Sequence, residues 1–167
     1  SSLLSSSTRM LVAAGDDDPD RLKLYTELAS ELLDRASLAD RVETARLLAD
    51  FAPAPRSILR RLARDDWSVA EPILSRAKTF TAVDLLGILA VVPETHAECI
   101  ARRPGLGDDV ALALINRGEV APTRALLDNP TFKMTAEHAE ALAAIGHADP
   151  VILAAIGQAP PIAGDDS

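Results

Sequence analysis

The sequence predicts an all-α protein, an α-solenoid of about ten helices that form stacked short helical hairpins. Three observations lead to this fold class. Alanine and leucine account for 54 of the 167 residues and aromatic residues for 3%, and helices favour the former whereas strands favour aromatic and β-branched side chains. Apolar residues recur at helical spacing through most of the chain. A pattern of large apolar residues also returns every 26 residues.

The chain begins with a serine-rich stretch. Residues 1–17 show no clear periodicity, and we expect them to form a mobile leader. The acidic run that ends this stretch, together with Pro19, marks the start of the first helix, because acidic side chains complement the positive end of the helix dipole and proline fits the first turn. Leucines at helical spacing continue this helix to about Ala36.

Three further helices are predicted in the first half of the chain. Ser37 is a typical N-cap residue for the second helix, and the prolines that follow Phe51 end it, because proline disfavours helical geometry in the residue before it. A third helix covers residues 58–64. Asp65 or Asp66 then caps a fourth helix, which carries apolar residues as far as residue 74.

From residue 74 onward the sequence is close to periodic. Three pairs of apolar residues, six positions apart within each pair, follow one another at steps of 26: Leu74 with Phe80, Ile100 with Leu106, and Leu126 with Phe132. A polar break lies within each pair. A second short helix is predicted after each pair, over residues 83–91, 110–115 and 139–145, and a last helix covers residues 151–156.

A period of about 20–50 residues made of two short helices is typical of an α-solenoid. One such hairpin cannot bury its own apolar stripe, whereas stacked neighbours bury each other's. We therefore expect a helical repeat domain over residues 18–158, a right-handed stack of about five hairpins, followed by a flexible acidic tail over residues 159–167. The alternative is an irregular helical bundle in which the spacing arises by chance.

The repeated runs resemble a known family. The segments are Val69-Ala-Glu-Pro-Ile-Leu-Ser-Arg-Ala, His96-Ala-Glu-Cys-Ile-Ala-Arg-Arg-Pro-Gly-Leu and Arg124-Ala-Leu-Leu-Asp-Asn-Pro. They are similar to bacterial HEAT-like and leucine-rich-variant repeats, and more closely to the DUF2336 family of uncharacterised, mainly alphaproteobacterial proteins. The resemblance covers roughly residues 20–158. It implies a HEAT-like repeat domain in the bacterial cytoplasm with an interaction role, and it transfers no catalytic residue. Family members are often longer, which leaves open that this chain is a fragment.

The composition argues against several functional classes. The single cysteine, Cys99, excludes a disulfide framework and a cysteine-rich zinc site, and it suits a reducing compartment. No apolar run approaches the roughly 18–20 residues of a membrane span. The formal net charge of −8 works against binding to nucleic acid and to anionic membranes. We therefore expect neither a nucleic-acid partner nor a membrane.

No motif in the sequence predicts catalysis, a metal site or a cofactor. His96 and His138 each begin an H-x-E triplet, but the P-C-x-x-C half of a zinc deaminase signature is absent. The aspartate pairs at 65–66 and 108–109 stand where helices begin, where aspartate caps backbone N–H groups. Glycine-rich phosphate loops and a G-x-S-x-G nucleophile are missing as well. We therefore expect no enzyme activity.

One basic feature is a candidate binding site. Arg56, Arg60 and Arg64 are spaced at i, i+4 and i+8, so they share a helix face, and Trp67 follows them. Three guanidinium groups in a row can bind a carboxylate-rich or phosphorylated partner. The alternative is a solvated face with ion pairs to nearby aspartates, each worth about 0–1 kcal/mol. We expect Trp67 to pack between hairpins, or to anchor an interface if it is exposed.

The sequence thus predicts a noncatalytic protein–protein interaction or scaffold domain, which binds an unknown protein or peptide on a helical-repeat surface. Self-association through the first amphipathic helix, giving a homo-oligomer, is one form of this role. A first alternative is a regulatory or sensory domain of a longer signalling protein. A second is a HEAT-like DNA-binding or repair enzyme, which needs a basic groove with aromatic residues, whereas this chain is acidic and has five aromatic residues.

Overall fold

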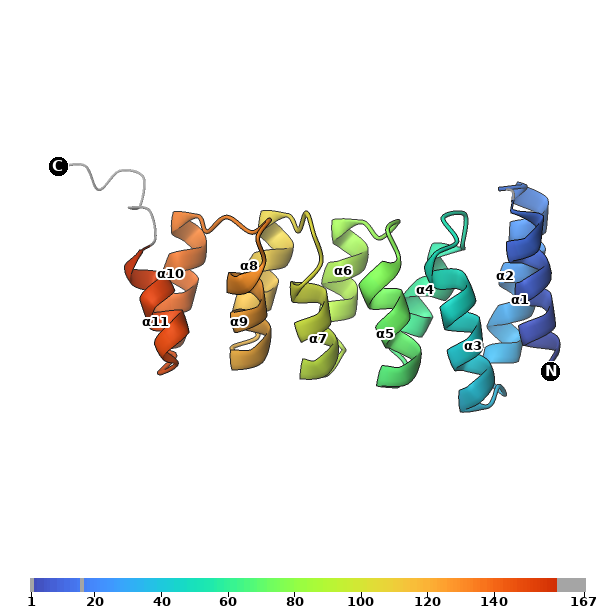
Figure 1. The fold of residues 1–167 in the computed structure, drawn as a ribbon, viewed down its shortest axis with the longest axis horizontal. Coiled ribbons are helices and arrows are strands. Elements are labelled where there is room, and N and C mark those ends of the chain that lie inside the picture. The colour runs from blue at the N-terminus through green and yellow to red at the C-terminus, as the bar shows by residue number, and fades with distance from the viewer. Residues whose placement is uncertain (1, 16, 159–167) are drawn as a thin grey trace. The chain divides into compact units, whose positions relative to one another are not determined.

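The computed structural model describes residues 2–15 and 17–158, and these residues form eleven α-helices and no strand (Figure 1). The all-α class predicted from the composition is therefore confirmed. The helices are α1 (Leu3–Ala14), α2 (Pro19–Leu33), α3 (Leu38–Ala49), α4 (Arg56–Ala63), α5 (Trp67–Arg76), α6 (Ala82–Leu89), α7 (Glu94–Ala101), α8 (Asp108–Asn116), α9 (Val120–Asp128), α10 (Ala136–Ile145) and α11 (Pro150–Gly157).

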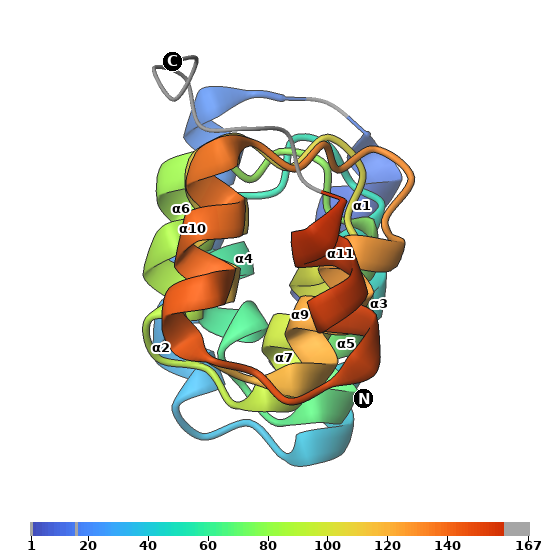
Figure 2. The ribbon, with the colours of Figure 1, turned by 90° about the vertical axis from the view of Figure 1, so that its left-hand side faces the viewer.

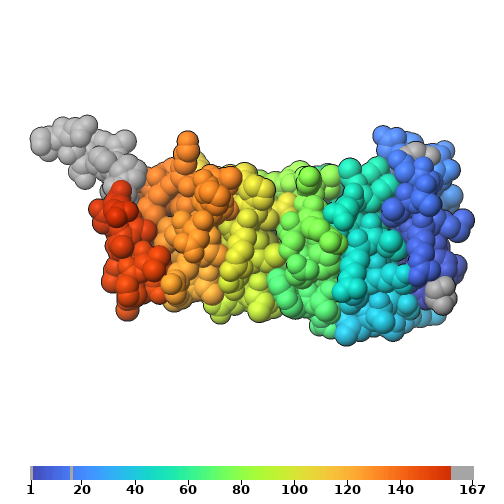
Figure 3. Space-filling model, viewed as in Figure 1, coloured from blue at the N-terminus to red at the C-terminus, as the bar shows by residue number. Residues whose placement is uncertain are grey.

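The chain divides into two compact units, Ser1–Asp84 and Leu85–Ser167. In the first unit, α3 packs between α1 and α5, while α2 and α4 pack against each other in a second layer. In the second unit, α9 packs between α7 and α11, and α8 packs against α10 in the other layer (Figure 2). Side chains fill the spaces between neighbouring helices of each unit on the face that Figure 3 presents.

Residues 3–14 differ from the mobile leader that the sequence predicts, because they form α1, which packs on α2 and α3. Ser2 caps this helix by accepting a hydrogen bond from the Ser5 N–H at 3.1 Å. The periodicity is hidden in the sequence because two of its four buried positions are polar, Ser5 and Thr8. The Thr8 hydroxyl lies 2.7 Å from both the Leu4 carbonyl and the Tyr25 hydroxyl, so its burial leaves no polar group without a partner.

Two predicted helix starts are confirmed. Asp18 is the N-cap of α2 and accepts a hydrogen bond from the Asp20 N–H, with Pro19 at the first helical position. Ser37 is the N-cap of α3 and accepts from the Asp40 N–H at 3.2 Å. These caps lie where the sequence places them because capping depends on residues within one turn of each other.

The residues that mark the 26-residue period are core residues. Leu74, Ile100 and Leu126 lie in α5, α7 and α9, and each is fully buried. Their partners Phe80, Leu106 and Phe132 are half-buried in the turns that follow these helices. The second short helices are α6, α8 and α10, and α11 is the last helix. The predicted tail, residues 159–167, lies outside the described residues.

Among the described residues, no helix has both the length and the apolar character that a membrane span requires.

Candidate functional site

The predicted arginine row is largely used within the first unit. Arg56 and Arg60 lie in α4 and both point to Asp84 of α6. The Arg60 Nη1 lies 2.9 Å from Asp84 Oδ1, and the Arg56 Nη1 lies 3.4 Å from Oδ2. The Asp84 side chain is 4% exposed, whereas the two arginines keep about half of their surface in solvent. The row therefore has a structural role that joins α4 to the start of α6.

Asp84 also closes a reciprocal cap on α6. The Thr81 N–H donates to Asp84 Oδ2 at 2.9 Å, and the Asp84 N–H donates to the Thr81 hydroxyl at 3.1 Å. Burial raises the pKa of Asp84, but hydrogen bonds from Thr81 and Arg60 and the charge of Arg56 outweigh it, so its pKa lies below the usual value. This carboxylate is thus ionised at neutral pH and is held by three donors, which are the Thr81 N–H and the guanidinium groups of Arg56 and Arg60.

Arg64 and Trp67 lie beyond this cluster. Arg64 ends α4, and its Nε donates to the Arg60 carbonyl at 3.2 Å. Trp67 begins α5 and is 42% exposed, so it is a partly exposed aromatic residue. Asp65 pairs with Arg41 at 2.9 Å instead of with the row. A binding role of the arginine row stays a prediction. Sequence reasoning missed Asp84, the carboxylate that pairs with two of these arginines. The T-x-x-D spacing of a capping box at 81–84 was the available signal.

The two H-x-E histidines have local hydrogen-bond partners. His138 accepts from the Thr135 N–H through Nδ1 at 3.1 Å, so Nε2 carries the proton and donates to the Asp108 carbonyl at 3.1 Å. Its backbone N–H donates in turn to the Thr135 hydroxyl, which completes a capping box on α10. His96 Nδ1 lies 2.9 Å from the Thr95 hydroxyl. These contacts give His138 a structural role between α8 and α10.

The aspartate pairs lie at helix starts, as predicted, although their contacts differ. Asp108 and Asp109 occupy the first turn of α8, where they complement the helix dipole. Asp66 is the N-cap of α5, but its side chain makes no capping hydrogen bond. It lies 3.7 Å from Arg41, so its charge contributes to an ion-pair cluster instead.

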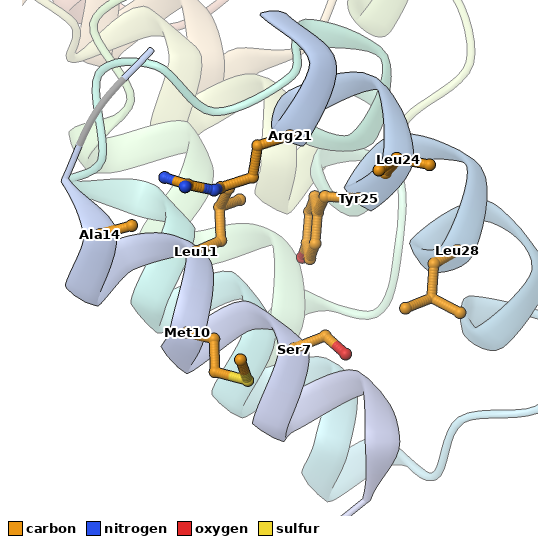
Figure 4. A pocket seen from close by; sticks show the side chains of 8 residues that line it. All are labelled: Ser7, Met10, Leu11, Ala14, Arg21, Leu24, Tyr25 and Leu28. Carbon is orange, nitrogen blue, oxygen red and sulfur yellow. The ribbon is translucent and has the colours of Figure 1, made fainter. Parts of the chain in front are cut away.

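An apolar groove lies between α1 and α2 of the first unit (Figure 4). Its volume is about 400 Å³. Side chains from both helices form its walls, and they are Ser7, Met10, Leu11, Ala14, Arg21, Leu24, Tyr25 and Leu28. All but Ser7 and Arg21 are apolar or aromatic, and the Arg21 guanidinium extends across the end of the groove near Ala14.

Tyr25 fixes the floor of this groove. Its ring is buried between the two helices, and its hydroxyl lies 2.7 Å from the Thr8 hydroxyl. Since the Thr8 hydroxyl donates to the Leu4 carbonyl, the Tyr25 hydroxyl donates to Thr8. Burial raises the pKa of Tyr25 to about 12 and outweighs the hydrogen bond that the Thr8 hydroxyl can give to the ionised oxygen, which lowers the pKa. This hydrogen bond holds α1 and α2 at a fixed spacing below the groove.

The walls of the groove expose large apolar side chains. Met10 is 73% exposed and Leu24 is 68% exposed, and Leu28 is half-buried beside them. The sequence indicates Tyr25 and Leu28 as part of an amphipathic helix, but the groove has a second wall, α1. Because residues 3–14 are predicted to be a leader, sequence reasoning does not find this surface.

Two further hollows have walls of mixed polarity. One of about 300 Å³ lies at the ends of α3 and α5, where Arg76 is 3.6 Å from Asp50. Another, of about 400 Å³, lies on α7 and α9 of the second unit, where Arg102 pairs with Glu98 at 2.6 Å. Each of the two hollows is lined by charged side chains of both signs.

Comparison with known proteins identifies a family. A family model described as an uncharacterised protein conserved in bacteria (DUF2336) matches residues 69–165, which is more than half of the chain. The match begins at Val69, where the first of the repeated runs begins, and residues 20–68 of the predicted resemblance lie outside it. No curated protein and no solved structure matches the chain.

Proposed function

The chain belongs to the DUF2336 family, and on this premise we propose that it is a noncatalytic protein–protein interaction domain of the bacterial cytoplasm. Its binding surface is the α1/α2 groove, defined as the cleft that Met10, Leu24, Leu28 and their neighbours line. Its ligand is an apolar helical segment of a partner protein. The hairpins of the chain stack as an α-solenoid of the HEAT-like type, the architecture that leaves long surfaces free for binding.

The observation that carries this proposal is the exposed apolar groove. Large apolar side chains such as Met10 and Leu24 are unfavourable in water. Burying them against a partner stabilises the complex by about 25 cal/mol per Å² of apolar surface. Methionine is unbranched and adapts its shape to different partners. Grooves between two helices accept the apolar face of a third helix, whose anchors are spaced at i, i+3 or i+4 and i+7.

The proposed interaction role also agrees with the structural contacts of the charged residues. Asp84, Arg56 and Arg60 hold α4 and α6 together, and His138 caps α10. Arg56, Arg60 and His138 are residues that the sequence analysis singled out, and each has structural partners. They support a scaffold in which polar side chains hold the helices together and the exposed apolar surface binds a partner.

The test compares a groove variant with a matched control. Met10→Glu/Leu24→Glu places two charges in the groove, whereas Val83→Glu/Val91→Glu makes the same change at residues that are 77% and 64% exposed and lie outside it. Each variant and the wild type are immobilised and incubated with bacterial lysate, and circular dichroism checks that all three are equally helical. We expect a protein that the wild type and the control retain and the groove variant loses.

An identical set of retained proteins for all three chains would contradict the proposal. The charge reversal of Arg56, Arg60 and Arg64 is not a suitable probe, because it would place new carboxylates against the buried Asp84 and destabilise the first unit.

A further inference from the structure

The arginine row of α4, which consists of Arg56, Arg60 and Arg64, carries more positive charge than its structural partner balances. Among the described residues, Asp84 is the carboxylate that pairs with the row, and it pairs with Arg56 and Arg60. Arg64 is exposed, and its side chain donates to a neutral group, the Arg60 carbonyl. Three guanidinium groups thus share one carboxylate, on a chain whose formal net charge is −8.

The surroundings of the row do not remove this excess of positive charge. Helix α4 and its C-cap residue carry four arginines and no acidic residue. The neighbouring α2 carries three acidic and two basic side chains, and Asp34, which follows it, pairs with Arg61 at 2.5 Å. Asp65 and Asp66 lie 2.9 Å and 3.7 Å from Arg41 of α3, so their ion pairs are made with a different helix. The layer that α2, α4 and Asp84 form therefore remains positive at the row.

Asp84 holds two guanidinium groups of the row in place without using all of their donors. One nitrogen of Arg56 and one of Arg60 reach the carboxylate, which leaves the other guanidinium nitrogens to other acceptors. The two arginine side chains are 50% and 43% exposed, whereas the carboxylate is 4% exposed, so an anion in solvent meets the guanidinium groups and not Asp84. Because these long side chains are already ordered, binding on them costs less side-chain entropy than binding on mobile arginines.

The length of the row favours one kind of anionic partner. Residues four positions apart on a helix are separated by about 6 Å along its axis, so the row extends over about 12 Å. A single phosphoryl group is too small to reach all three arginines, whereas a helix with carboxylates at i, i+4 and i+8 has the same spacing of about 6 Å. We propose that the arginine row binds an acidic helix of a partner protein, in which glutamate or aspartate recurs at every fourth position. This surface is separate from the α1/α2 groove, and each can be tested without the other.

Fluorescence anisotropy of labelled peptides tests this contact. The first peptide carries glutamate at every fourth position, the second has glutamine at the same positions, and the third carries a single phosphoserine. Arg64→Glu is the row variant, because Arg64 is exposed and lies outside the Asp84 ion pairs. Arg46→Glu is the matched control, since Arg46 of α3 is also exposed and its reversal changes the net charge equally. Circular dichroism checks that both variants are as helical as the wild type.

We expect the wild type to bind the glutamate peptide saturably, with an affinity that falls as salt increases, and not to bind the glutamine peptide. Arg64→Glu should raise the Kd at least about tenfold, because it removes one guanidinium group and adds a repelling carboxylate. Arg64→Gln, which removes the charge without reversing it, should give a smaller loss. Arg46→Glu should raise the Kd less than about threefold, through long-range repulsion alone.

Three results would overturn the inference. The first is no saturable binding of the glutamate peptide to the wild type, or equal binding of the glutamine peptide. The second is an equal loss of affinity in Arg64→Glu and Arg46→Glu, because the binding would then depend on net charge and not on the row. The third is tighter binding of the phosphoserine peptide than of the glutamate peptide, which would assign the row to a single phosphoryl group.

Discussion

Asp84 illustrates how one buried carboxylate organises several segments. It closes the Thr81 cap of α6 and pairs with Arg56 and Arg60 of α4, which lie 28 and 24 residues earlier in the chain. The arginines alone form a basic helix face. Their ion pairs with the one carboxylate of Asp84 make that face a link between two helices.

Replacement of Asp84 should destabilise the protein in a pH-dependent way. Asp84→Ala removes the cap acceptor and leaves two arginines without their carboxylate, and we expect the free energy of unfolding at pH 7 to fall by about 1–3 kcal/mol. Because the folded-state pKa of Asp84 is lowered, its stabilisation is present above the unfolded pKa of about 3.9 and is lost as pH falls through the lower folded value.

Urea unfolding followed by circular dichroism between pH 7 and pH 3 measures this effect. The difference between wild type and Asp84→Ala should shrink on acidification. Asp34→Ala serves as the control, because its pair with Arg61 is largely exposed, and it should change stability by less than about 1 kcal/mol. A difference for Asp84→Ala that does not vary with pH would contradict the assignment.

Tyr25 gives a second residue-scale prediction, because it is the single tyrosine of the chain. Absorbance of the tyrosinate should titrate near pH 12 in the folded protein and near pH 10 in denaturant. Since the folded pKa is raised, burial of the neutral hydroxyl stabilises the fold fully below about pH 10, and this contribution is lost as pH rises through 12. A midpoint near 10 with helical content intact would show that the Tyr25 hydroxyl is not buried against Thr8.

At the scale of helices, arginine side chains repeatedly bind carbonyls at the end of an earlier helix or in the turn that follows it. Arg117 donates to the carbonyls of Leu89 and Val92 at the end of α6, and its Nε pairs with Glu119 at 2.5 Å. Arg61 donates to the Ser30 carbonyl at 2.9 Å, and Arg41 to the Ala36 carbonyl at 2.9 Å. Helix C-termini leave carbonyls without intrahelical partners, and these arginines supply the missing donors.

Substitution of Arg117 should therefore loosen the end of α6. Arg117→Lys keeps the charge but lacks the planar fork that reaches two carbonyls and a carboxylate. We expect the free energy of unfolding to fall by about 1–3 kcal/mol, with faster amide hydrogen exchange at residues 89–92. Arg124→Lys is the matched control, since Arg124 is half-exposed and lies 3.9 Å from Asp149. Equal effects of the two substitutions would contradict a specific role for Arg117.

Helix α1 shows which elements the sequence conceals. Helices with leucine or alanine on the buried face, such as α3 with Ala45 and Leu48, are evident from spacing. In α1 the buried face carries Ser5 and Thr8, and their burial is compensated by hydrogen bonds to residues that the sequence alone does not bring near. An amphipathic pattern fails as a signal when the partners of its polar members come from other helices.

At the scale of the whole molecule, net charge leads to a prediction about nucleic acid. The chain carries a formal net charge of −8, and each phosphate contact requires a lysine or arginine that displaces a counterion. We expect no saturable binding of a fluorescently labelled DNA duplex by anisotropy at about 50 mM salt, where electrostatic binding is strongest. Saturable binding that weakens as salt increases would instead favour a DNA-binding role.

The sequence by itself determined the all-α class, the family, the start of α2 and α3, and the buried residues of the 26-residue period. These depend on local propensity, capping and spacing, which act over a few residues. The tertiary structure decided that Arg56 and Arg60 bind Asp84, that residues 3–14 form a helix, and that α1 and α2 enclose a groove. Each of these joins residues from different helices, and a side chain's partner across such a distance depends on how the helices pack.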